Sequence, residues 1–222
     1  MKNIFKQLGE IGIIPVIAID DAAQAIPLGK ALLDGGLPCA EITFRTAAAA
    51  EAIQRMSSVY PQMLVGAGTV LTVEQAKQAK AAGACFVATP GFDMAVVDYC
   101  QENAFPITPG VMTPTDINQA LTKGLKLLKF FPAEAAGGIK TLRAIGAPYV
   151  GVKFIPTGGI HVNNFAEYLS LPMVHACGGS WIAKKELISS GQFETISQLA
   201  REAVSLVASV RNSGGGQWVS VL

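Results

Sequence analysis

The sequence predicts a single-domain (β/α)8 barrel, or TIM barrel, with an N-terminal helix. Eight short apolar segments alternate with longer amphipathic or Ala-rich segments over nearly all of the 222 residues. Strands that alternate with helices pair in parallel, because each crossover returns the chain to the same edge of the sheet. Eight such units in about 200 residues match the short end of the size range of this barrel.

The elements follow from local signals in chain order. We expect strands over residues 12–18, 39–44, 63–67, 85–89, 105–108, 127–131, 152–157 and 174–178. We expect helices over residues 1–10, 21–34, 47–58, 72–82, 93–103, 114–123, 138–146, 163–169 and 192–211. Helix starts are indicated by Asp20, Asp21, Thr72, Gln75, Thr113, Pro114 and Asp116, and helix ends by Gly35, Gly36, Gly83 and Gly124. The first helix is expected to cover the bottom of the barrel, and residues 213–222 to form a flexible tail.

An open, doubly wound sheet is the alternative arrangement of the same elements. It predicts a glycine-rich dinucleotide-binding loop after the first strand, but residues 16–21 contain no glycine. Gly66 and Gly68 resemble half of such a loop, yet Leu71 stands where the third glycine is required. The missing glycines therefore favour the barrel.

The composition excludes several classes of protein. Half of the residues are hydrophobic, which excludes a disordered chain, and the net charge of +1 leaves no basic excess to attract a nucleic acid. No segment approaches the roughly 20 apolar residues of a membrane span, and an early acidic residue argues against a signal peptide. The four cysteines are scattered and there are only two histidines, so we expect buried thiols and no metal site. These features predict a cytoplasmic protein without a metal, membrane or nucleic acid partner.

One lysine stands inside the predicted strand over residues 127–131. Side chains alternate along a strand, so Lys129 shares a face with Leu127 and Phe131, whereas Leu128 and Phe130 share the other. If the latter two pack under the helices, Lys129 points toward the barrel axis and loses hydration. Desolvation favours the neutral amine, which is the nucleophile of a Schiff-base lysine. A lysine that reaches the rim, or one held in a structural ion pair, is the alternative.

A second strand carries polar side chains at alternating positions. Glu41, Thr43 and Arg45 share one face, opposite Ile42 and Phe44. If the apolar pair faces the helices, a carboxylate, a hydroxyl and a guanidinium point into the barrel. A carboxylate beside an amine can relay protons, and an arginine can hold a substrate carboxylate. A structural ion pair between Glu41 and Arg45, with or without Lys129, is the alternative, although buried ion pairs are poor stabilisers.

Paired glycines indicate an anion site at the ends of the last two strands. Thr157-Gly158-Gly159 ends the seventh strand, and Gly178-Gly179-Ser180 ends the eighth. Paired glycines let backbone N–H groups approach a ligand, and the loops after strands seven and eight are the usual phosphate site of this barrel. Either pair alone could be only a tight turn; together they favour a phosphorylated substrate.

Two further segments lie at the predicted rim. Thr69 follows the third strand and Pro90 the fourth, and turn chemistry alone could explain both. His161 is interpreted as a neighbour of a helix cap. His175 and Cys177 are interpreted as ordinary strand residues rather than ligands.

Five motifs stand in the order in which they occur in one enzyme family. They are Glu41-Ile42-Thr43-Phe44-Arg45-Thr46, Gly66-Ala67-Gly68-Thr69-Val70-Leu71, Lys129-Phe130-Phe131-Pro132-Ala133-Glu134, Pro156-Thr157-Gly158-Gly159-Ile160 and Gly178-Gly179-Ser180-Trp181. Between residues 10 and 211 the chain resembles the 2-keto-3-deoxy-6-phosphogluconate (KDPG) aldolases, a class I family that includes the 4-hydroxy-2-oxoglutarate (KHG) aldolases. The motif over residues 129–134 is the most specific of the five.

The resemblance implies a role for each matching residue. Lys129 would be the Schiff-base lysine and Glu41 the general acid and base. Arg45 and Thr69 would hold the pyruvate carboxylate, and Pro90 and Phe131 would shape the pyruvyl pocket. Thr157 would influence the stereochemical preference at the aldehyde carbon. The phosphate would be bound by Gly158, Gly159, Gly179 and Ser180. The resemblance also implies a cytoplasmic homotrimer that serves the Entner–Doudoroff pathway and needs neither a metal nor an organic cofactor.

The implied reaction is the cleavage of KDPG to pyruvate and glyceraldehyde 3-phosphate by a carbon–carbon lyase. KHG, which would yield pyruvate and glyoxylate, could share the pocket. The preferred aldehyde, the stereoselectivity at C4 and the role of the glycine-rich tail stay open. A phosphate-binding barrel isomerase would use the same loops without needing the lysine, and a barrel that only binds ligands would not need Lys129, Glu41 and Arg45 together.

Overall fold

The computed structural model describes residues 4–213 of the chain. In this range the strands are β1 (Ile13–Ile17), β2 (Cys39–Thr43), β3 (Leu64–Gly68), β4 (Val87–Ala88), β5 (Ile107–Thr108), β6 (Gly110–Val111), β7 (Leu127–Phe130), β8 (Lys153–Pro156) and β9 (Cys177–Gly179). The helices are α1 (Ile4–Ile11), the 3-10 turn η1 (Ala22–Gln24), α2 (Ala25–Asp34), α3 (Ala49–Val59), α4 (Val73–Ala81), α5 (Met94–Glu102), α6 (Pro114–Thr122), α7 (Gly138–Gly146), α8 (Val162–Leu169), α9 (Lys185–Ser189) and α10 (Phe193–Ser213). Each predicted strand and helix is found within a few residues of its expected bounds. The expected tail lies, after Ser213, outside the described residues.

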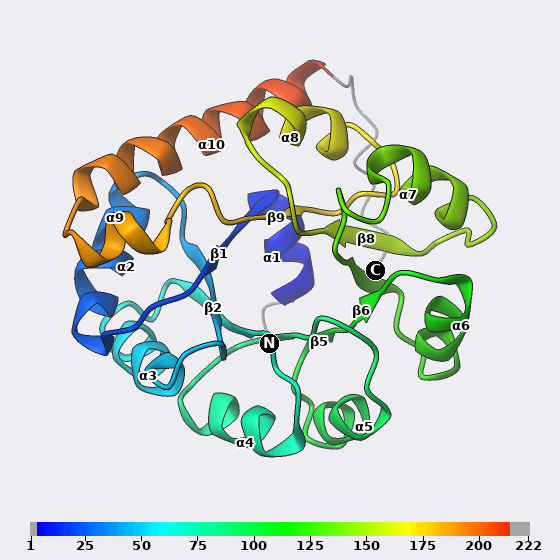
Figure 1. The fold of residues 1–222 in the computed structure, drawn as a ribbon, viewed down its shortest axis with the longest axis horizontal. Coiled ribbons are helices and arrows are strands. Elements are labelled where there is room, and N and C mark those ends of the chain that lie inside the picture. The colour runs from blue at the N-terminus through cyan, green and yellow to red at the C-terminus, as the bar shows by residue number, and fades with distance from the viewer. Residues whose placement is uncertain (1–3, 214–222) are drawn as a thin grey trace.

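All paired strands run parallel. One sheet has six strands in the order β5-β4-β3-β2-β1-β9, and the other has three in the order β6-β7-β8. Glu41 of β2 lies opposite Val16 of β1 and Gly66 of β3, and Lys129 of β7 lies opposite Gly110 of β6. Figure 1 shows the strands around a common centre, with the larger helices outside them. The fold is therefore α/β with a curled parallel sheet, which agrees with the predicted class.

Two elements differ from the prediction. The expected strand over residues 105–108 is β5, and a further short strand, β6, follows it after Pro109. Proline has no N–H to donate to a sheet; its carbonyl accepts a hydrogen bond from the amide of Lys129 (2.9 Å). β5 pairs with β4 whereas β6 pairs with β7, so the chain passes from one sheet to the other at Pro109. The five-residue helix α9 is absent from the prediction because it is too short to show a helical period.

Apolar side chains pack on both faces of the strands. The larger group lies between strands and helices and includes Ile42, Leu128 and Phe130. The smaller group, called here the inner apolar layer, consists of Leu8, Ile14, Cys39, Leu64, Phe86, Leu127, Ile155 and Ala176. These residues lie near the starts of the strands, and Leu8 comes from α1, which is at the centre of the ring of strands in Figure 1. Helix α1 therefore closes the end of the sheet where the strands begin.

Local capping explains several helix bounds. Thr113 and Asp116 form a reciprocal capping box at the start of α6, in which the amide of Thr113 donates to Asp116 Oδ2 (2.9 Å). The hydroxyl of Thr72 accepts from the amide of Gln75 at the start of α4 (3.2 Å). Gly124, after α6, has a φ of 72°, which glycine adopts at little cost. These contacts confirm the corresponding start and stop signals of the sequence.

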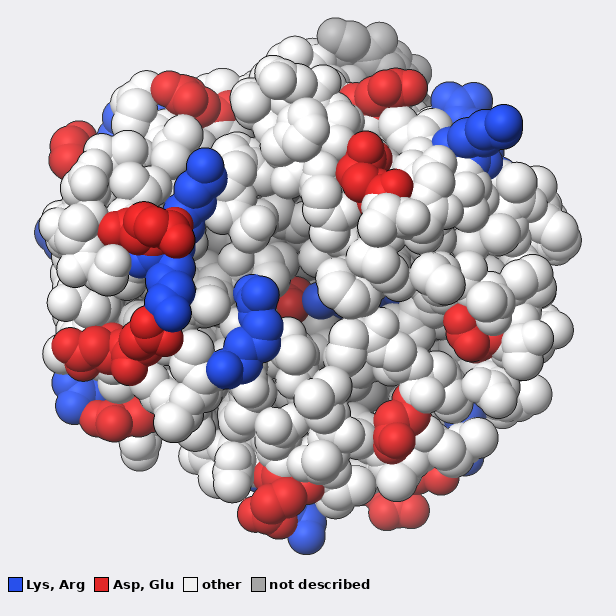
Figure 2. Space-filling view, viewed as in Figure 1, with Lys and Arg blue, Asp and Glu red and all other residues white. Residues whose placement is uncertain are grey.

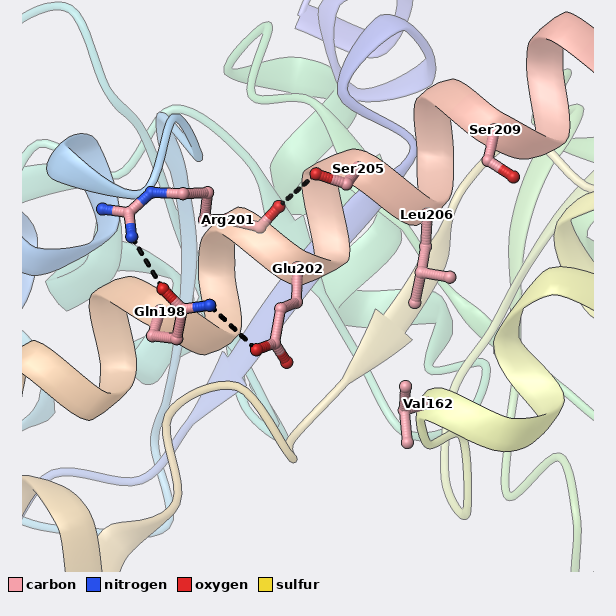
Figure 3. Close-up of a pocket in the computed structure, with 7 residues that line it drawn as sticks. All are labelled: Val162, Gln198, Arg201, Glu202, Ser205, Leu206 and Ser209. Atoms are coloured by element: carbon pink, nitrogen blue, oxygen red, sulfur yellow. Dashed lines mark hydrogen bonds between the residues drawn. The ribbon is translucent and has the colours of Figure 1, made fainter.

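Helix α10, with 21 residues, forms one wall of an open groove on the outer surface (Figure 3). The groove has a volume of about 590 Å³ and is lined by Val162, Gln198, Arg201, Glu202, Ser205, Leu206 and Ser209. Its polar side chains bond to one another: Arg201 donates to Gln198 Oε1 (2.8 Å), and Gln198 Nε2 donates to Glu202 Oε1 (3.0 Å). No residue predicted to bind substrate lines it. Over residues 4–213 we find no helix with the length and apolar character that crossing a membrane requires.

Candidate active site

The centre of the candidate site is a buried ion pair between β7 and β2. Lys129 Nζ lies 2.9 Å from Glu41 Oε1, and the two side chains are 5% and 3% exposed. Leu128 and Phe130 pack in the outer core, so the alternation of β7 turns Lys129 to the inside, as predicted. The lysine does not reach the rim. Its charge partner is Glu41, whose carboxylate was predicted to point into the same interior.

Gly68 of β3 provides the space for this carboxylate. A Cβ at residue 68 would overlap Glu41 Oε1 and lie 2.7 Å from Glu41 Cγ, which is closer than real contacts allow. Gly68 lies opposite Thr43, the next residue after Glu41 on the same face of β2. The glycine therefore lets the Glu41 carboxylate lie against β3 and reach Lys129.

An aromatic ring lies over the amine. The ring centroid of Phe131 is 5.6 Å from Lys129 Nζ, within the range of a cation–π contact. Figure 2 shows a hollow at the centre of this face of the molecule, with an acidic and a basic surface in contact at its floor. A small carbonyl compound that enters such a hollow can reach an amine that water reaches poorly.

Thr43 and Arg45 continue the polar face of β2 toward the mouth of the hollow. Thr43 Oγ1 donates to the carbonyl of Ile17 (2.9 Å), and Arg45 Nε donates to Thr43 Oγ1 (3.2 Å). Arg45 is exposed, and within residues 4–213 the ion-pair partner of Glu41 is Lys129 and not Arg45. The alternative of a structural ion pair is therefore wrong for Arg45, whereas an ion pair of Glu41 with Lys129 is present. The terminal nitrogens of the guanidinium remain available to an anion.

Thr69 and Pro90 lie after β3 and β4. Thr69 is half-buried and has a φ of 53°, a left-handed conformation that threonine rarely adopts and that is typical of functional sites. Pro90 is also half-buried, in a turn fixed by Thr89. The Thr89 hydroxyl donates to the carbonyl of Gly91 (2.6 Å) and accepts from the amide of Gly110 (3.2 Å). Turn chemistry accounts for Thr89, whereas it does not account for the backbone of Thr69.

The loop after β8 presents free backbone amides. Gly158 and Gly159 have φ values of 97° and 79°. The carbonyl of Gly158 accepts from the amide of Glu134 (3.0 Å), and that of Gly159 accepts from Asn164 Nδ2 (3.1 Å). The parallel bridge between Thr157 and Gly178 directs the amide of Gly158 toward β9, whereas within the described part of the chain the amides of Gly159 and Ile160 donate no hydrogen bond. Successive free amides of this kind form an anion-binding arrangement.

The end of β9 lies beside this loop. Thr157 forms an isolated parallel bridge with Gly178, and a Cβ at residue 178 would overlap the Thr157 hydroxyl. Thr157 is buried, and Gly179 is packed so closely against the Trp181 ring that a Cβ would overlap it. Ser180, the next residue, is exposed. The structure thus brings together the two glycine segments that the sequence analysis assigns to an anion.

Three side chains without a role in the sequence analysis hold these loops. Tyr168 of α8 donates a hydrogen bond from its hydroxyl to Glu134 Oε1, and Asn164 of α8 bonds to Gly159. Glu134 closes the most specific motif of the sequence, which was a signal for its importance. Tyr168 is 34 residues from its partner, so no local pattern marks the contact.

The remaining histidines and cysteines are not clustered. His161 is itself the N-cap of α8 rather than a neighbour of the cap, and its Nδ1 accepts from the amide of Asn163 (3.3 Å). His175 lies just before β9 rather than in it, and its Nε2 is 2.7 Å from the carbonyl of Phe5. Cys39, Cys100 and Cys177 are buried, as expected, whereas Cys85 is only half-buried. Among residues 4–213, no group of three or more His, Cys, Asp and Glu side chains could hold a metal ion.

The site therefore combines two chemical capacities. A buried amine bonded to a carboxylate can attack a carbonyl carbon while the carboxylate exchanges protons with the adduct. At the ends of β8 and β9, free amides and the exposed Ser180 can bind an anion. A substrate with a ketone at one end and an anionic group at the other fits this arrangement.

Comparison with known proteins gives consistent matches. The family model "Aldolase: KDPG and KHG aldolase" matches residues 4–199. The chain is 47% identical over 207 residues to the 2-dehydro-3-deoxy-phosphogluconate aldolase of Treponema pallidum. The aligned residues cover 93% of this chain and 99% of the relative.

Solved structures match over the same length. One is a crystal structure of the KDPG aldolase of Legionella pneumophila with pyruvate captured at low pH as a covalent carbinolamine intermediate. It matches this chain with a TM-score of 0.87 and 39% sequence identity, and the match covers 90% of this chain and 97% of that chain. The KDPG aldolase of Zymomonas mobilis with 3-phosphoglycerate has a TM-score of 0.83 and 36% identity, over 93% of this chain and 97% of that one.

Proposed function

The chain belongs to the KDPG and KHG aldolase family, and on this premise we propose that it is a class I aldolase that cleaves KDPG to pyruvate and glyceraldehyde 3-phosphate. The observation that carries the proposal is the buried 2.9 Å contact between Lys129 Nζ and Glu41 Oε1. The enzyme is a carbon–carbon lyase whose nucleophile is an amine of the chain. Its reaction serves the Entner–Doudoroff pathway.

Lys129 and Glu41 carry the chemistry. The Lys129 ammonium passes a proton to the Glu41 carboxylate, and the resulting neutral amine attacks the C2 ketone to form a carbinolamine. The Glu41 carboxyl then returns that proton to the carbinolamine hydroxyl, which leaves as water, and an iminium ion forms. The Glu41 carboxylate then takes the proton of the C4 hydroxyl, the C3–C4 bond breaks, and its electrons move into the iminium to form an enamine. Glyceraldehyde 3-phosphate leaves, the Glu41 carboxyl gives the proton it has taken to C3 of the enamine, and water hydrolyses the resulting iminium ion to release pyruvate from Lys129.

The other site residues bind the two halves of the substrate. Arg45 and Thr69 hold the pyruvate carboxylate, a role supported by the exposed guanidinium and the left-handed backbone. Pro90 and Phe131 shape the pyruvyl pocket, and Thr157 influences stereochemical preference at the aldehyde carbon. The phosphate is received by Gly158, Gly159, Gly179 and Ser180. The free amides beside β8 support this assignment, as does the 3-phosphoglycerate of the Zymomonas mobilis structure.

The fold proposal is that residues 1–222 form one domain in which the two sheets close into a (β/α)8 barrel. Two isolated parallel bridges support closure on one side, between Phe154 and Val174 and between Thr157 and Gly178. On the other side, β5 and β6 are separated by Pro109 alone, so they can act as one strand that pairs with both sheets.

The protein is proposed to work as a homotrimer in the cytoplasm, with a small-molecule substrate as its partner. The segments that follow β3, β4 and β6 each expose a large apolar side chain, Leu71, Met94 and Met112. Contact between copies would remove this apolar surface from water. Light scattering should give three times the mass of one chain, and Leu71→Glu should lower that mass. A monomeric mass for the unmodified protein would contradict the proposal.

Reduction with sodium borohydride in the presence of pyruvate tests the proposed chemistry. Intact mass and peptide mapping should locate a reduced pyruvyl adduct on Lys129. Folded protein without an adduct would refute the Schiff base and favour a phosphate-binding isomerase that uses the same loops. Turnover of KDPG and of KHG, compared side by side, then defines the aldehyde half; we expect both to be cleaved, since the family description names both.

A further inference from the structure

We propose that Glu134 and Tyr168 form a positioning pair that holds the loop after β8 in the shape that receives a phosphate. The pair acts on the phosphate half of the substrate and not on the reacting amine. The proposal rests on the proposed function, because it concerns the same site and the same substrate.

The pair joins two elements on either side of the loop. Tyr168 is fully buried in α8, and its hydroxyl donates to Glu134 Oε1 in the turn between β7 and α7. Burial and the contact with Glu134 raise the pKa of Tyr168 above its ordinary value of 10.0. The hydroxyl therefore keeps its proton at neutral pH and remains a donor to the carboxylate.

Glu134 contacts the loop with its backbone and with its side chain. Its amide donates to the carbonyl of Gly158 (3.0 Å), and the amide of Ala133 donates to the carbonyl of Thr157 (2.8 Å). A Cβ at Gly159 would lie 2.5 Å from Glu134 Cβ and 2.6 Å from Cγ. The stem of Glu134 is thus the surface on which the backbone of Gly159 rests, and residue 159 has to be glycine for this approach.

These contacts occupy the carbonyls of the loop and leave its amides free. The carbonyl of Gly158 is taken by Glu134 and that of Gly159 by Asn164 of α8. Both acceptors are therefore directed toward the protein, and the N–H groups of Gly159 and Ile160 are left for an anion. If either partner moved, the loop could rotate and present carbonyl oxygens, which repel phosphate.

The pair also keeps the negative charge of Glu134 engaged. A Cβ at Gly138 would lie 3.1 Å from Glu134 Oε1 and 3.3 Å from Tyr168 Oη, so the carboxylate lies beside the first residue of α7. A carboxylate at a helix N-terminus is stabilised by the helix dipole. Without the Tyr168 hydroxyl, this charge would be free to turn toward the loop and weaken phosphate binding.

The test compares Tyr168→Phe, Glu134→Ala and Glu134→Gln with the unmodified enzyme. Three quantities are measured: KM and kcat for KDPG, inhibition by inorganic phosphate, and exchange of the methyl protons of pyruvate with solvent. The exchange uses Lys129 and the enamine but no phosphate. Tyr60→Phe is the matched control, since it also removes a hydroxyl bonded to a carbonyl, that of Ile26 (3.0 Å), away from the site.

Tyr168→Phe and Glu134→Ala should raise KM for KDPG about tenfold, the effect of losing one hydrogen bond to a charged group. Inhibition by phosphate should weaken in parallel, while kcat and pyruvate exchange stay near the unmodified values. Glu134→Gln keeps an oxygen that accepts from Tyr168, so it should retain the lower KM. Tyr60→Phe should change none of these quantities.

An unchanged KM in Tyr168→Phe and Glu134→Ala would overturn the proposal. An equal loss of pyruvate exchange would also overturn it, because the damage would then extend beyond the phosphate loop. If Tyr168→Phe fails to fold, the exposed Glu134 still allows the comparison of Ala with Gln. An unmodified protein that exchanges pyruvate protons without cleaving KDPG would refute the proposed substrate instead. The affinities of the unmodified protein and of Tyr168→Phe for inorganic phosphate would then test the positioning pair, and equal affinities would overturn it.

Discussion

Replacement of Gly68 by alanine would displace the Glu41 carboxylate without changing either member of the ion pair. The added Cβ would overlap Glu41 Oε1 and lie 2.7 Å from Cγ and 2.8 Å from Cδ, whereas ordinary contact begins at 3.4 Å. The carboxylate must therefore move by 0.6 Å or more, which disrupts its 2.9 Å contact with Lys129. A misplacement of roughly 1 Å costs on the order of 100-fold in rate, so we expect kcat to fall by about that factor.

The assay couples pyruvate release to lactate dehydrogenase, and the control is Gly66→Ala on the same face of β3. A Cβ at residue 66 would overlap the ring of Phe86 in the inner apolar layer, and its three nearest atoms would all belong to that ring. Gly66→Ala should therefore lose about 1–3 kcal/mol of stability through overpacking and keep its kcat. Borohydride trapping should still label Lys129 in Gly68→Ala. Equal kcat values for the two variants would refute the idea that the position of Glu41 limits the rate.

Four further predictions follow from single residues. Lys129→Ala should remain folded and bind inorganic phosphate but lose all cleavage of KDPG, and residual turnover near the unmodified rate would exclude the Schiff base. Burial lowers the pKa of His175 below 6.5, so the unfolded chain takes up a proton at a higher pH than the folded chain. The free energy of unfolding should therefore fall as the pH drops below 6.5, and urea titrations of His175→Gln should show a weaker dependence. Burial raises the pKa of Cys100 to about 11 and that of Cys85 to about 12, so a thiol reagent should modify both slowly in the native protein and rapidly in urea. Thr113→Ala removes the capping box of α6 and should lower the free energy of unfolding by about 1 kcal/mol, as measured by urea denaturation.

The elements that could be predicted are those whose signals are local. Thr113 and Asp116 stand next to the helix that they cap, and the alternation around Lys129 is contained in β7 itself. β6 is different, because it has two residues and exists through the pairing of Gly110 with Lys129, a partner from another part of the chain. A pattern read over a window of residues cannot contain such a partner.

The same distinction separates the predicted from the missed parts of the site. The inward direction of Lys129 and Glu41 follows from strand alternation, although the two residues are 88 positions apart. The contact of Glu134 with Tyr168 has no such signal, since a buried aromatic residue in α8 is fully explained by the core. The hydrogen-bond partner of the Tyr168 hydroxyl depends on how α8 packs against the turn after β7, and the local sequence contains no information on that packing.

The closure of one end of the sheet by α1 has a consequence for the kinetic order of the reaction. Because the inner apolar layer fills the interior near the starts of the strands, ligands reach Lys129 from the loop end. Gly159 and Ser180 are exposed at that end, so in the proposed binding mode the phosphorylated fragment lies between the pyruvyl group and the solvent. Glyceraldehyde 3-phosphate must then depart first and pyruvate last. In the direction of synthesis, pyruvate must bind before the aldehyde, which makes the mechanism compulsorily ordered.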